Sequence, residues 1–335
     1  MKQAIKQIAL AVLMGLLMPG VLLSAAILLI NREDETQLVT AVTQISIQNT
    51  ASTTEAYVHQ ALSIPVQMDD GTVQTMDIND YLTGVLLAEI PVSFEAEAQK
   101  AQAVVARTYV LKRYLLQYKH ENGAVCTNPA CCQGYLSNED YLEKGGDQAG
   151  IERMRSAVEQ TQDQVLTFEN TLIDATYFSC SGGSTEDALA VWGVDIPYLQ
   201  STSSPGEENA AHYSDTVSFG VEEFRTLLQT ELTGDPKDWF GAVTYTTGGG
   251  VATMEIGGVT YQGTQLRQLL GLRSTDFTVT VTDSQITIQT HGYGHRVGMS
   301  QYGADAMAAS GSDYTKILAH YYTGTNLVSW ETVLD

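Results

Sequence analysis

Basic residues are scarce in this sequence. Its 335 residues include 17 lysines and arginines against 39 aspartates and glutamates, which gives a formal net charge of −22 at pH 7. A chain this acidic is repelled by phosphate backbones, and it contains no basic patch that would compensate. We therefore expect no nucleic acid among its partners.

Cysteine is also scarce. Four cysteines are too few for the disulfide framework of a small secreted protein. Three of them, Cys126, Cys131 and Cys132, fall within seven residues. This clustering needs an explanation of its own.

Charge is absent from one long apolar segment near the N-terminus. Ile8 to Ile30 is a run of 23 residues, about enough to cross a hydrocarbon core of roughly 30 Å. Lys2 and Lys6 precede it, which predicts a cytoplasmic N-terminus and an extracytoplasmic remainder. A cleaved signal peptide is the alternative, with small residues at 24–26, but the apolar run continues past them. We favour an uncleaved anchor in the cell membrane.

This anchor divides the chain into four parts. Residues 1–7 form a cytoplasmic tail and residues 8–30 a transmembrane signal-anchor. Residues 31–62 are rich in Thr, Ser, Gln and Asn, as expected for an extracytoplasmic linker. Residues 63–335 form the globular domain.

Helices are predicted first in this domain. One runs over about 79–89 and is stopped by Pro91, since the residue before a proline avoids helical dihedrals. A second begins near Phe94 with an apolar stripe, and a third covers about 150–161. Two further helices close the chain after residue 300.

Between these helices the pattern alternates as in antiparallel strands. Hairpins are predicted to turn at Asp70-Gly71, Glu169-Asn170 and Gly257-Gly258, and another spans about 276–290. A short helix follows the third hairpin, with Thr264 as its expected cap. The fold class is α+β, with mixed helices and antiparallel hairpins around a substrate cleft.

Glu89 lies on the apolar face of the first helix. Leu82, Val85, Leu86 and Glu89 fall at i, i+3, i+4 and i+7 and therefore share one side. Lost hydration and the C-terminal end of the helix dipole both raise the pKa of a carboxyl placed there. Glu89 is then either a half-exposed residue without function or a general acid for a glycosidic oxygen.

The stretch "HGYGHRVGMSQYGA", residues 291–304, combines glycines with polar side chains. It is neither GxGxxG nor a Walker A motif. His295, Ser300, Gln301 and Tyr302 offer the donors and acceptors that a polyhydroxylated substrate requires. The alternative is a structural glycine turn.

Two further stretches carry possible binding residues. In "FSCSGGSTEDALAVWG", residues 178–193, Trp192 either stacks on sugar rings or belongs to the core. In "HENGAVCTNPACC", residues 120–132, the side chains suited to a tetrahedral zinc site are His120, Cys126, Cys131 and Cys132. An extracytoplasmic location permits disulfides among these cysteines instead.

These motifs together resemble the stage II sporulation protein D family (SpoIID, related to the LytB amidase enhancers). The resemblance runs from about residue 63 to the C-terminus. It rests on "YLTGVLLAEIPVSFEAEAQKAQAVVARTYVL", "SGGSTEDALAVWG", "PYL", "GHRVGMSQYGADAMA" and "ILAHYYTGT", in this order.

The resemblance implies a peptidoglycan lytic transglycosylase of endospore formation that acts during forespore engulfment. It implies that Glu89 is the catalytic residue, and that the substrate is glycan stripped of stem peptides. A hydrolase usually needs two carboxylates, whereas one suffices for a lyase that forms 1,6-anhydro ends. Arg107 on the second helix would orient substrate or hold the helix pair. The implied partners are stage II sporulation proteins P, an amidase, and M.

The resemblance also bears on the cysteine loop and on one unusual arginine. Some clostridial members bind zinc in this loop. Cys126 and Cys132 match their metal-binding pair in spacing, His120 matches a histidine nearby, and Cys131 stands where they have a second histidine. Arg296 replaces the glycine usual in "GHGVGMSQ", which we expect to alter the charge of the cleft. Two alternatives remain: a non-catalytic glycan-binding or amidase-enhancing module, and a zinc hydrolase that uses the cysteine loop.

Overall fold

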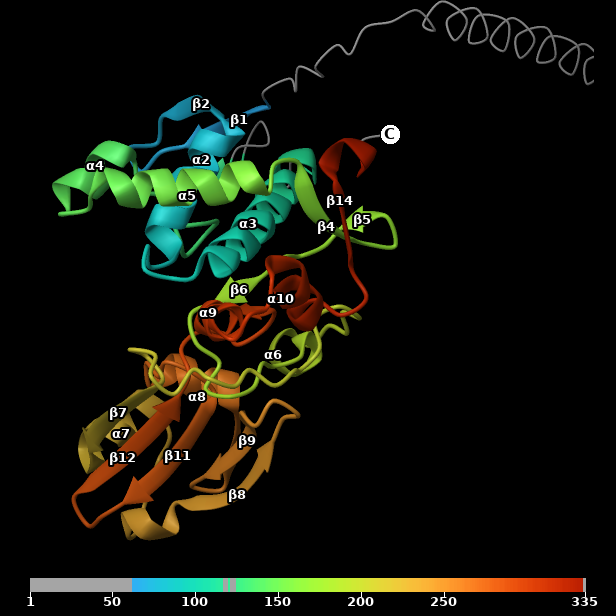
Figure 1. Ribbon diagram of the computed structural model, residues 1–335. Helices are drawn as coiled ribbons and strands as arrows, with labels where there is room; N and C mark the ends of the chain where they lie inside the picture. Colours follow the sequence, from blue (N-terminus) through green and yellow to red (C-terminus); the bar gives the residue numbers. More distant parts are fainter. Residues whose placement is uncertain (1–61, 117–119, 121–124, 334–335) are drawn as a thin grey trace, which may run out of the picture. The chain divides into compact units, whose positions relative to one another are not determined.

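The computed structural model describes residues 62–116, 120 and 125–333 (Figure 1). The predicted tail (1–7), the predicted anchor (8–30) and all of the predicted linker except residue 62 lie outside these residues. Among the helices that the structure does describe, none is long and apolar enough to cross a membrane.

The described chain begins with a hairpin of β1 (Ser63–Gln67) and β2 (Val73–Asp77). The turn lies at Asp70-Gly71 as predicted, and Gly71 has a φ of 84°, which glycine adopts without steric cost. β3 (Val125–Cys126) pairs parallel with β1 and brings the cysteine loop to this sheet.

α2 (Ile78–Glu89) follows β2 directly. The Asp77 carboxylate caps it by accepting from the amides of Asn79 and Asp80. The helix ends at Glu89 because Ile90, before the proline, is extended. The three apolar partners of Glu89 on its face are fully buried, which confirms the predicted helix and its buried side.

The longest described helix is α3 (Ala96–Leu116), which begins two residues after the predicted start. Phe94 lies in a turn instead, where its amide donates to the Pro91 carbonyl at 3.1 Å. α3 packs against α5 (Gln148–Gln160), α9 (Gln301–Ala309) and α10 (Tyr314–Tyr321) (Figure 1). Together with α2 and the short α4 (Asn138–Glu143), these helices surround the larger of two hydrophobic cores.

Small sheets border this helical core. β4 pairs antiparallel with both β5 and β14, and its turn to β5 lies at the predicted Glu169-Asn170. β6 pairs parallel with β13. The bounds are β4 (Gln164–Phe168), β5 (Thr171–Leu172), β6 (Tyr177–Phe178), β13 (Met299–Ser300), β14 (Asn326–Ser329) and the 3-10 helix η3 (Trp330–Val333).

A second hydrophobic core lies between two three-stranded antiparallel sheets and two helices. The sheets have the orders β11-β12-β7 and β10-β9-β8. Their bounds are β7 (Ser214–Gly220), β8 (Phe240–Tyr245), β9 (Val251–Ile256), β10 (Val259–Gln262), β11 (Asp276–Val281) and β12 (Gln285–His291). The helices are α7 (Val221–Leu228) and α8 (Gly263–Leu269), with η2 (Pro236–Asp238) before β8. The hairpins predicted at Gly257-Gly258 and over 276–290 are confirmed.

The predicted cap of α8 is wrong. The helix begins at Gly263 with Gln262 at its N-cap, and no side chain caps it. β10 runs straight into the helix, and Gly263 lies so close to the Val251 carbonyl that an added Cβ would clash with it. This contact sets the start of the helix, so Thr264 lies inside it. The predicted α+β class holds, as a mixed fold of several small, mostly antiparallel sheets.

Candidate functional site

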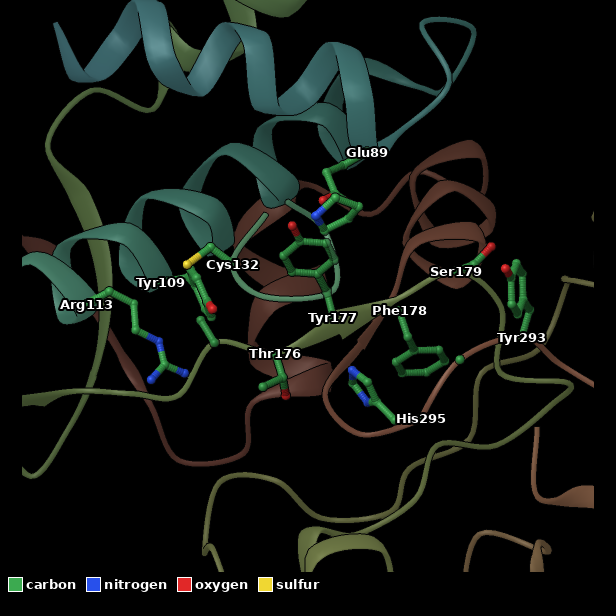
Figure 2. Close-up of a pocket in the computed structure, with 13 residues that line it drawn as sticks. Glu89, Tyr109, Arg113, Cys132, Thr176, Tyr177, Phe178, Ser179, Tyr293 and His295 are labelled. Carbon is green, nitrogen blue, oxygen red and sulfur yellow. The ribbon is translucent and has the colours of Figure 1, made fainter. Parts of the chain in front are cut away.

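Glu89 lines a pocket of about 510 Å³ (Figure 2). Helix α3, the cysteine loop, β6 and the glycine-rich turn before β13 contribute the walls. The side chains that line the pocket include Tyr109, Arg113, Cys132, Tyr177, Phe178 and His295. The pocket thus joins all four of the stretches singled out in the sequence.

The Glu89 carboxyl is half-buried and has two neutral donors. Its Oε1 accepts from the Gly134 amide at 2.5 Å, and the Tyr177 hydroxyl, which points at it in Figure 2, donates a second hydrogen bond. Burial raises the pKa of Glu89, while these two hydrogen bonds act in the opposite direction. The net shift is upward, in the direction predicted from the helical spacing.

Tyr177 is held in place to donate. It lies on β6, where it pairs with Met299, and its hydroxyl accepts from Gln133 Nε2 at 3.3 Å. Burial and the neighbouring Glu89 raise the pKa of Tyr177 well above its usual value. The phenol therefore stays protonated and can stabilise the Glu89 carboxylate after that residue gives up its proton.

His295 lines the other end of the pocket as a neutral ring. Its Nδ1 accepts from the Val297 amide at 3.1 Å, and the ring also hydrogen bonds to the Tyr177 backbone. Burial, reinforced by the charge of Arg267, lowers the pKa of His295 to about 4. Near neutral pH this imidazole carries no charge and does not compete with Glu89 as an acid.

Aromatic rings surround His295. The centroid of its ring lies 5.6 Å from that of Phe178 and 5.5 Å from that of Trp192. Trp192 ends α6 (Ala188–Trp192), which Asp187 caps, and it is 42% exposed. The alternative that Trp192 is a core residue is therefore wrong, and its face is available beside the pocket.

The four predicted metal ligands converge. The ligand atoms of His120, Cys126, Cys131 and Cys132 all lie within 4.8 Å of one another. His120 Nε2 lies 3.5 Å from the Cys131 sulfur and 3.3 Å from the Cys132 sulfur. Ligands on a tetrahedral zinc ion would be separated by roughly 3.6 Å for such a nitrogen–sulfur pair. The residues therefore fit a metal ion.

The disulfide alternative does not describe this structure. No disulfide joins any of the four cysteines, all of which lie among the described residues. Cys180 lies apart from the cluster, where its sulfur donates to the buried Glu207 at 2.9 Å. Because Cys132 also lines the pocket, a metal held by the cluster would brace one wall of the site that contains Glu89.

Arg107 occupies a different place from the one predicted for a substrate contact. It is 1% exposed, and its guanidinium donates to the carbonyls of Thr161 at 2.6 Å and Val158 at 2.9 Å. These bonds join α3 to the end of α5. A fully enclosed guanidinium has no donor to offer a sugar. Arg107 does hold two helices together, but the pair is α3 and α5 and not the first and second predicted helices.

The residues that line the pocket do not include Ser300, Gln301 or Tyr302. Ser300 is fully buried and caps α9 by accepting from the Gly303 amide at 3.2 Å. Gln301 is 7% exposed, and the Tyr302 ring packs edge-on against Phe94 at 5.0 Å. In this structure the three residues position α9 and do not contact the pocket.

Arg296 corrects a further expectation, because it points into the protein and leaves the charge of the pocket unchanged. It is 1% exposed, with a φ of 64°, a left-handed conformation that favours glycine. Its guanidinium donates to the Ser181 and Gly248 carbonyls, both at 2.8 Å, and pairs with Glu186 at 3.3 Å. The backbone explains the glycine expected here from the resemblance, and the buried contacts explain how arginine is tolerated.

Sequence reasoning missed several residues of the pocket. Tyr177 precedes the quoted "FSCSGG" stretch by one residue, and Tyr109 and Arg113 lie on α3 one turn apart. Gly134 follows the cysteine loop and supplies only its backbone. The proximity of Tyr177 to a recognised motif was the one usable signal.

Comparison with known proteins identifies the family of this chain. A sequence profile described as "Stage II sporulation protein" (SpoIID) matches residues 67–168, which include α2, α3 and the cysteine loop. The class is therefore that of the stage II sporulation proteins.

Individual relatives extend the match over most of the chain. Stage II sporulation protein D of Bacillus amyloliquefaciens is 38% identical over 280 residues, covering 82% of this chain and 81% of the relative. The Bacillus subtilis protein of the same name is 34% identical over 311 residues, covering 91% and 90%. The amidase enhancer of Bacillus subtilis is 28% identical over 302 residues, covering 74% of this chain and 40% of the relative. The chain belongs to the stage II sporulation protein D family.

Proposed function

We propose that this protein is a membrane-anchored lytic transglycosylase that cleaves peptidoglycan glycan strands during sporulation. The observation that carries the proposal is the environment of Glu89: a half-buried carboxyl with a raised pKa, held by two neutral donors inside a pocket. The cell-wall context comes from the family.

Glu89 acts first as an acid. Its protonated carboxyl donates to the oxygen between N-acetylmuramic acid and N-acetylglucosamine, and the bond from that oxygen to C1 breaks. The Gly134 amide and the Tyr177 hydroxyl stabilise the carboxylate that forms. Without these donors, the half-buried charge would be costly at this step.

Glu89 then acts as a base. Its carboxylate takes the proton of the muramic C6 hydroxyl while that oxygen attacks C1, which gives a 1,6-anhydro end and consumes no water. Of the described residues that line the pocket, Glu89 is the one carboxyl. Hydrolysis usually requires a second carboxylate, so this lining favours the single-residue route.

The zinc assignment is part of this proposal. His120, Cys126, Cys131 and Cys132 would hold the ion, and four protein ligands close its coordination sphere. Zinc bound in this way supplies stability to the loop and offers no open position for a catalytic water. This argues against the alternative of a zinc hydrolase.

Location and partners follow from the predicted segments and the family. We propose a single pass through the cell membrane by residues 8–30, with the N-terminus in the cytoplasm and the pocket outside, between the mother-cell and forespore membranes. Glycan strands without stem peptides are the substrate, and stage II sporulation proteins P and M are the proposed partners.

Product analysis tests the activity. The purified full chain in detergent is incubated with denuded glycan strands, and the new ends are identified by mass spectrometry. We expect 1,6-anhydro ends; reducing ends would contradict the proposal and favour a hydrolase. The similarity to an amidase enhancer supports a second candidate, a non-catalytic module. Intact strands together with a stimulated amidase would favour that module.

A further inference from the structure

Arg113 gives the Glu89 pocket one permanent positive charge. It lies on α3 and lines the pocket together with Tyr109, on the side away from His295 in Figure 2. Among the described lining residues it is the one side chain that is always a cation, since an arginine stays charged at any physiological pH. In a chain with a net charge of −22, a guanidinium in this pocket points to an anionic group on the ligand.

The guanidinium is positioned by its neighbour on the helix. Its Cζ lies 4.8 Å from the centroid of the Tyr109 ring, which precedes it by one turn. The Tyr109 hydroxyl in turn reaches the Cys131 carbonyl at 3.5 Å. The guanidinium also donates a hydrogen bond to the Tyr109 side chain. Because a guanidinium carries five N–H donors, it can keep this bond and bind a carboxylate through others.

The Glu89 carboxyl does not account for this arginine. The pKa of Glu89 is set by its own burial, the Gly134 amide and the Tyr177 hydroxyl, and Arg113 is not among these causes. A guanidinium paired with Glu89 would lower that pKa and remove the acid. The pocket therefore holds an acid and a cation that serve different atoms of a ligand.

We propose that Arg113 binds the free lactyl carboxylate of N-acetylmuramic acid and so makes the pocket select strands without stem peptides. This inference rests on the proposed function. The lactyl carboxylate is the ionisable group of the glycan backbone. In a strand that carries its peptide, the same carbonyl is an uncharged amide. A reaction that hydrolyses this amide must therefore precede cleavage and create the charge that Arg113 recognises.

The test compares three substrates on the full chain in detergent: denuded strands, denuded strands whose lactyl carboxyls are converted to methylamides, and peptide-bearing strands. The wild-type kcat/KM should be about 10- to 100-fold higher on the free carboxylate than on the methylamide, as expected for a charge-assisted hydrogen bond. Arg113→Gln should bring this ratio close to one. Arg113→Lys keeps the positive charge but loses the paired N–H donors that bind a carboxylate through both oxygens, so it should give an intermediate ratio.

Arg225 supplies a matched control. Its guanidinium Cζ lies 4.9 Å from the centroid of the Trp239 ring, at the second core and outside the pocket lining. Arg225→Gln removes a stacked guanidinium of the same geometry and should keep the wild-type ratio. Binding of each strand to Glu89→Gln, with and without Arg113→Gln, measures recognition separately from cleavage.

The outcomes separate the two proposals. Wild-type protein that cleaves both denuded substrates equally well, or Arg113→Gln that keeps the preference, overturns the inference and leaves the proposed function standing. Arg113-dependent binding of peptide-bearing strands, as tight as that of denuded ones, would assign the arginine to a peptide carboxylate and also overturn it. If no strand is cleaved, the proposed function fails, while the binding measurement still decides the role of Arg113.

Discussion

Two regions of the molecule bury a glutamate, one with neutral hydrogen-bond donors around the carboxyl and the other with a cation. At the pocket, Glu89 has an amide and a phenol as its donors. The second glutamate, Glu186, is fully buried where the glycine-rich turn meets the loop before β9. Its carboxylate pairs with the Arg296 guanidinium at 3.3 Å and accepts a hydrogen bond from the Gly250 amide at 3.0 Å. Burial raises the pKa of both carboxyls.

The difference lies in the partner and in access. The Arg296 guanidinium offsets the charge of the Glu186 carboxylate. Both side chains are enclosed, so this pair connects two parts of the fold away from solvent. Glu89 has no cation among the groups that set its pKa, and it faces an open pocket. A raised pKa alone therefore does not identify a catalytic acid; the neutral donors and the pocket distinguish Glu89.

The largest expected effect is on cleavage. Glu89→Gln should lower the rate on denuded strands by about 10²- to 10⁴-fold, because the amide neither gives nor takes the proton. The matched variant is Glu186→Gln, whose cleavage per folded molecule should stay within a few-fold of wild type. Equal losses in the two variants, measured on samples shown to be folded by circular dichroism, would erase the distinction between the two glutamates.

The second effect is on stability. Arg296→Met leaves a buried carboxyl and several carbonyls without their donor and should reduce the free energy of unfolding in urea by about 3–5 kcal/mol. Arg296→Gly loses the same contacts but relieves the left-handed backbone at a φ of 64°, which is worth about 1 kcal/mol. The glycine variant should therefore be the more stable of the two, and the reverse order would refute this account of the turn.

Metal removal should reduce the stability of the fold by as much as Arg296→Met does, or by less. A bound ion at 100 to 1,000 times its Kd stabilises a fold by about 3–4 kcal/mol, so a chelator should lower the melting temperature. Cys132→Ser should lose the metal measured by atomic emission, whereas Cys180→Ser, outside the cluster, should retain it. The zinc assignment would be excluded if the wild-type protein carries no stoichiometric metal and its melting temperature does not change with the chelator.

The smallest expected effect is a shift in pH dependence. The first step needs protonated Glu89, so the rate should fall as the pH rises through the raised pKa of Glu89. Tyr177 donates to the charged form and lowers this pKa; Tyr177→Phe should therefore move the fall in rate to higher pH. A fall that moves to lower pH would contradict the assigned hydrogen bond.

The same shift has a consequence for stability. The folded-state pKa of Glu89 lies above its unfolded value, so the charged carboxyl disfavours folding as the pH rises through this window. Glu89→Gln has no such charge, and its melting temperature at neutral pH should equal or exceed that of wild type. In acid, where Glu89 is protonated, this advantage should disappear.

The sequence predicted local features well because they depend on neighbouring residues. The side of α2 that carries Glu89 follows from helical spacing, and the hairpin turns follow from residues that accept a positive φ. The metal cluster was predicted because three of its ligands are close in the chain. In each case the signal spans only a few residues.

The roles of the arginines were not predictable in this way. Arg107 and Arg113 lie six residues apart on α3, a rotation of about 240° around the helix axis, so they face different surroundings. Only tertiary packing decides that Arg107 enters the junction with α5 and that Arg113 enters the pocket. The same limit applies to Ser300, Gln301 and Tyr302. Polar residues at the start of a helix can cap the helix as well as bind a ligand, and the sequence does not distinguish the two roles.

Cleavage in heavy-oxygen water tests most directly whether Glu89 works as a single acid and base. Denuded strands are incubated with the wild-type protein in this solvent, and the new muramic ends are weighed by mass spectrometry. We predict ends lighter by one water than a reducing end and free of the heavy isotope, all lost in Glu89→Gln. Heavy oxygen at C1 of the new ends would show that water attacks, and would contradict the account.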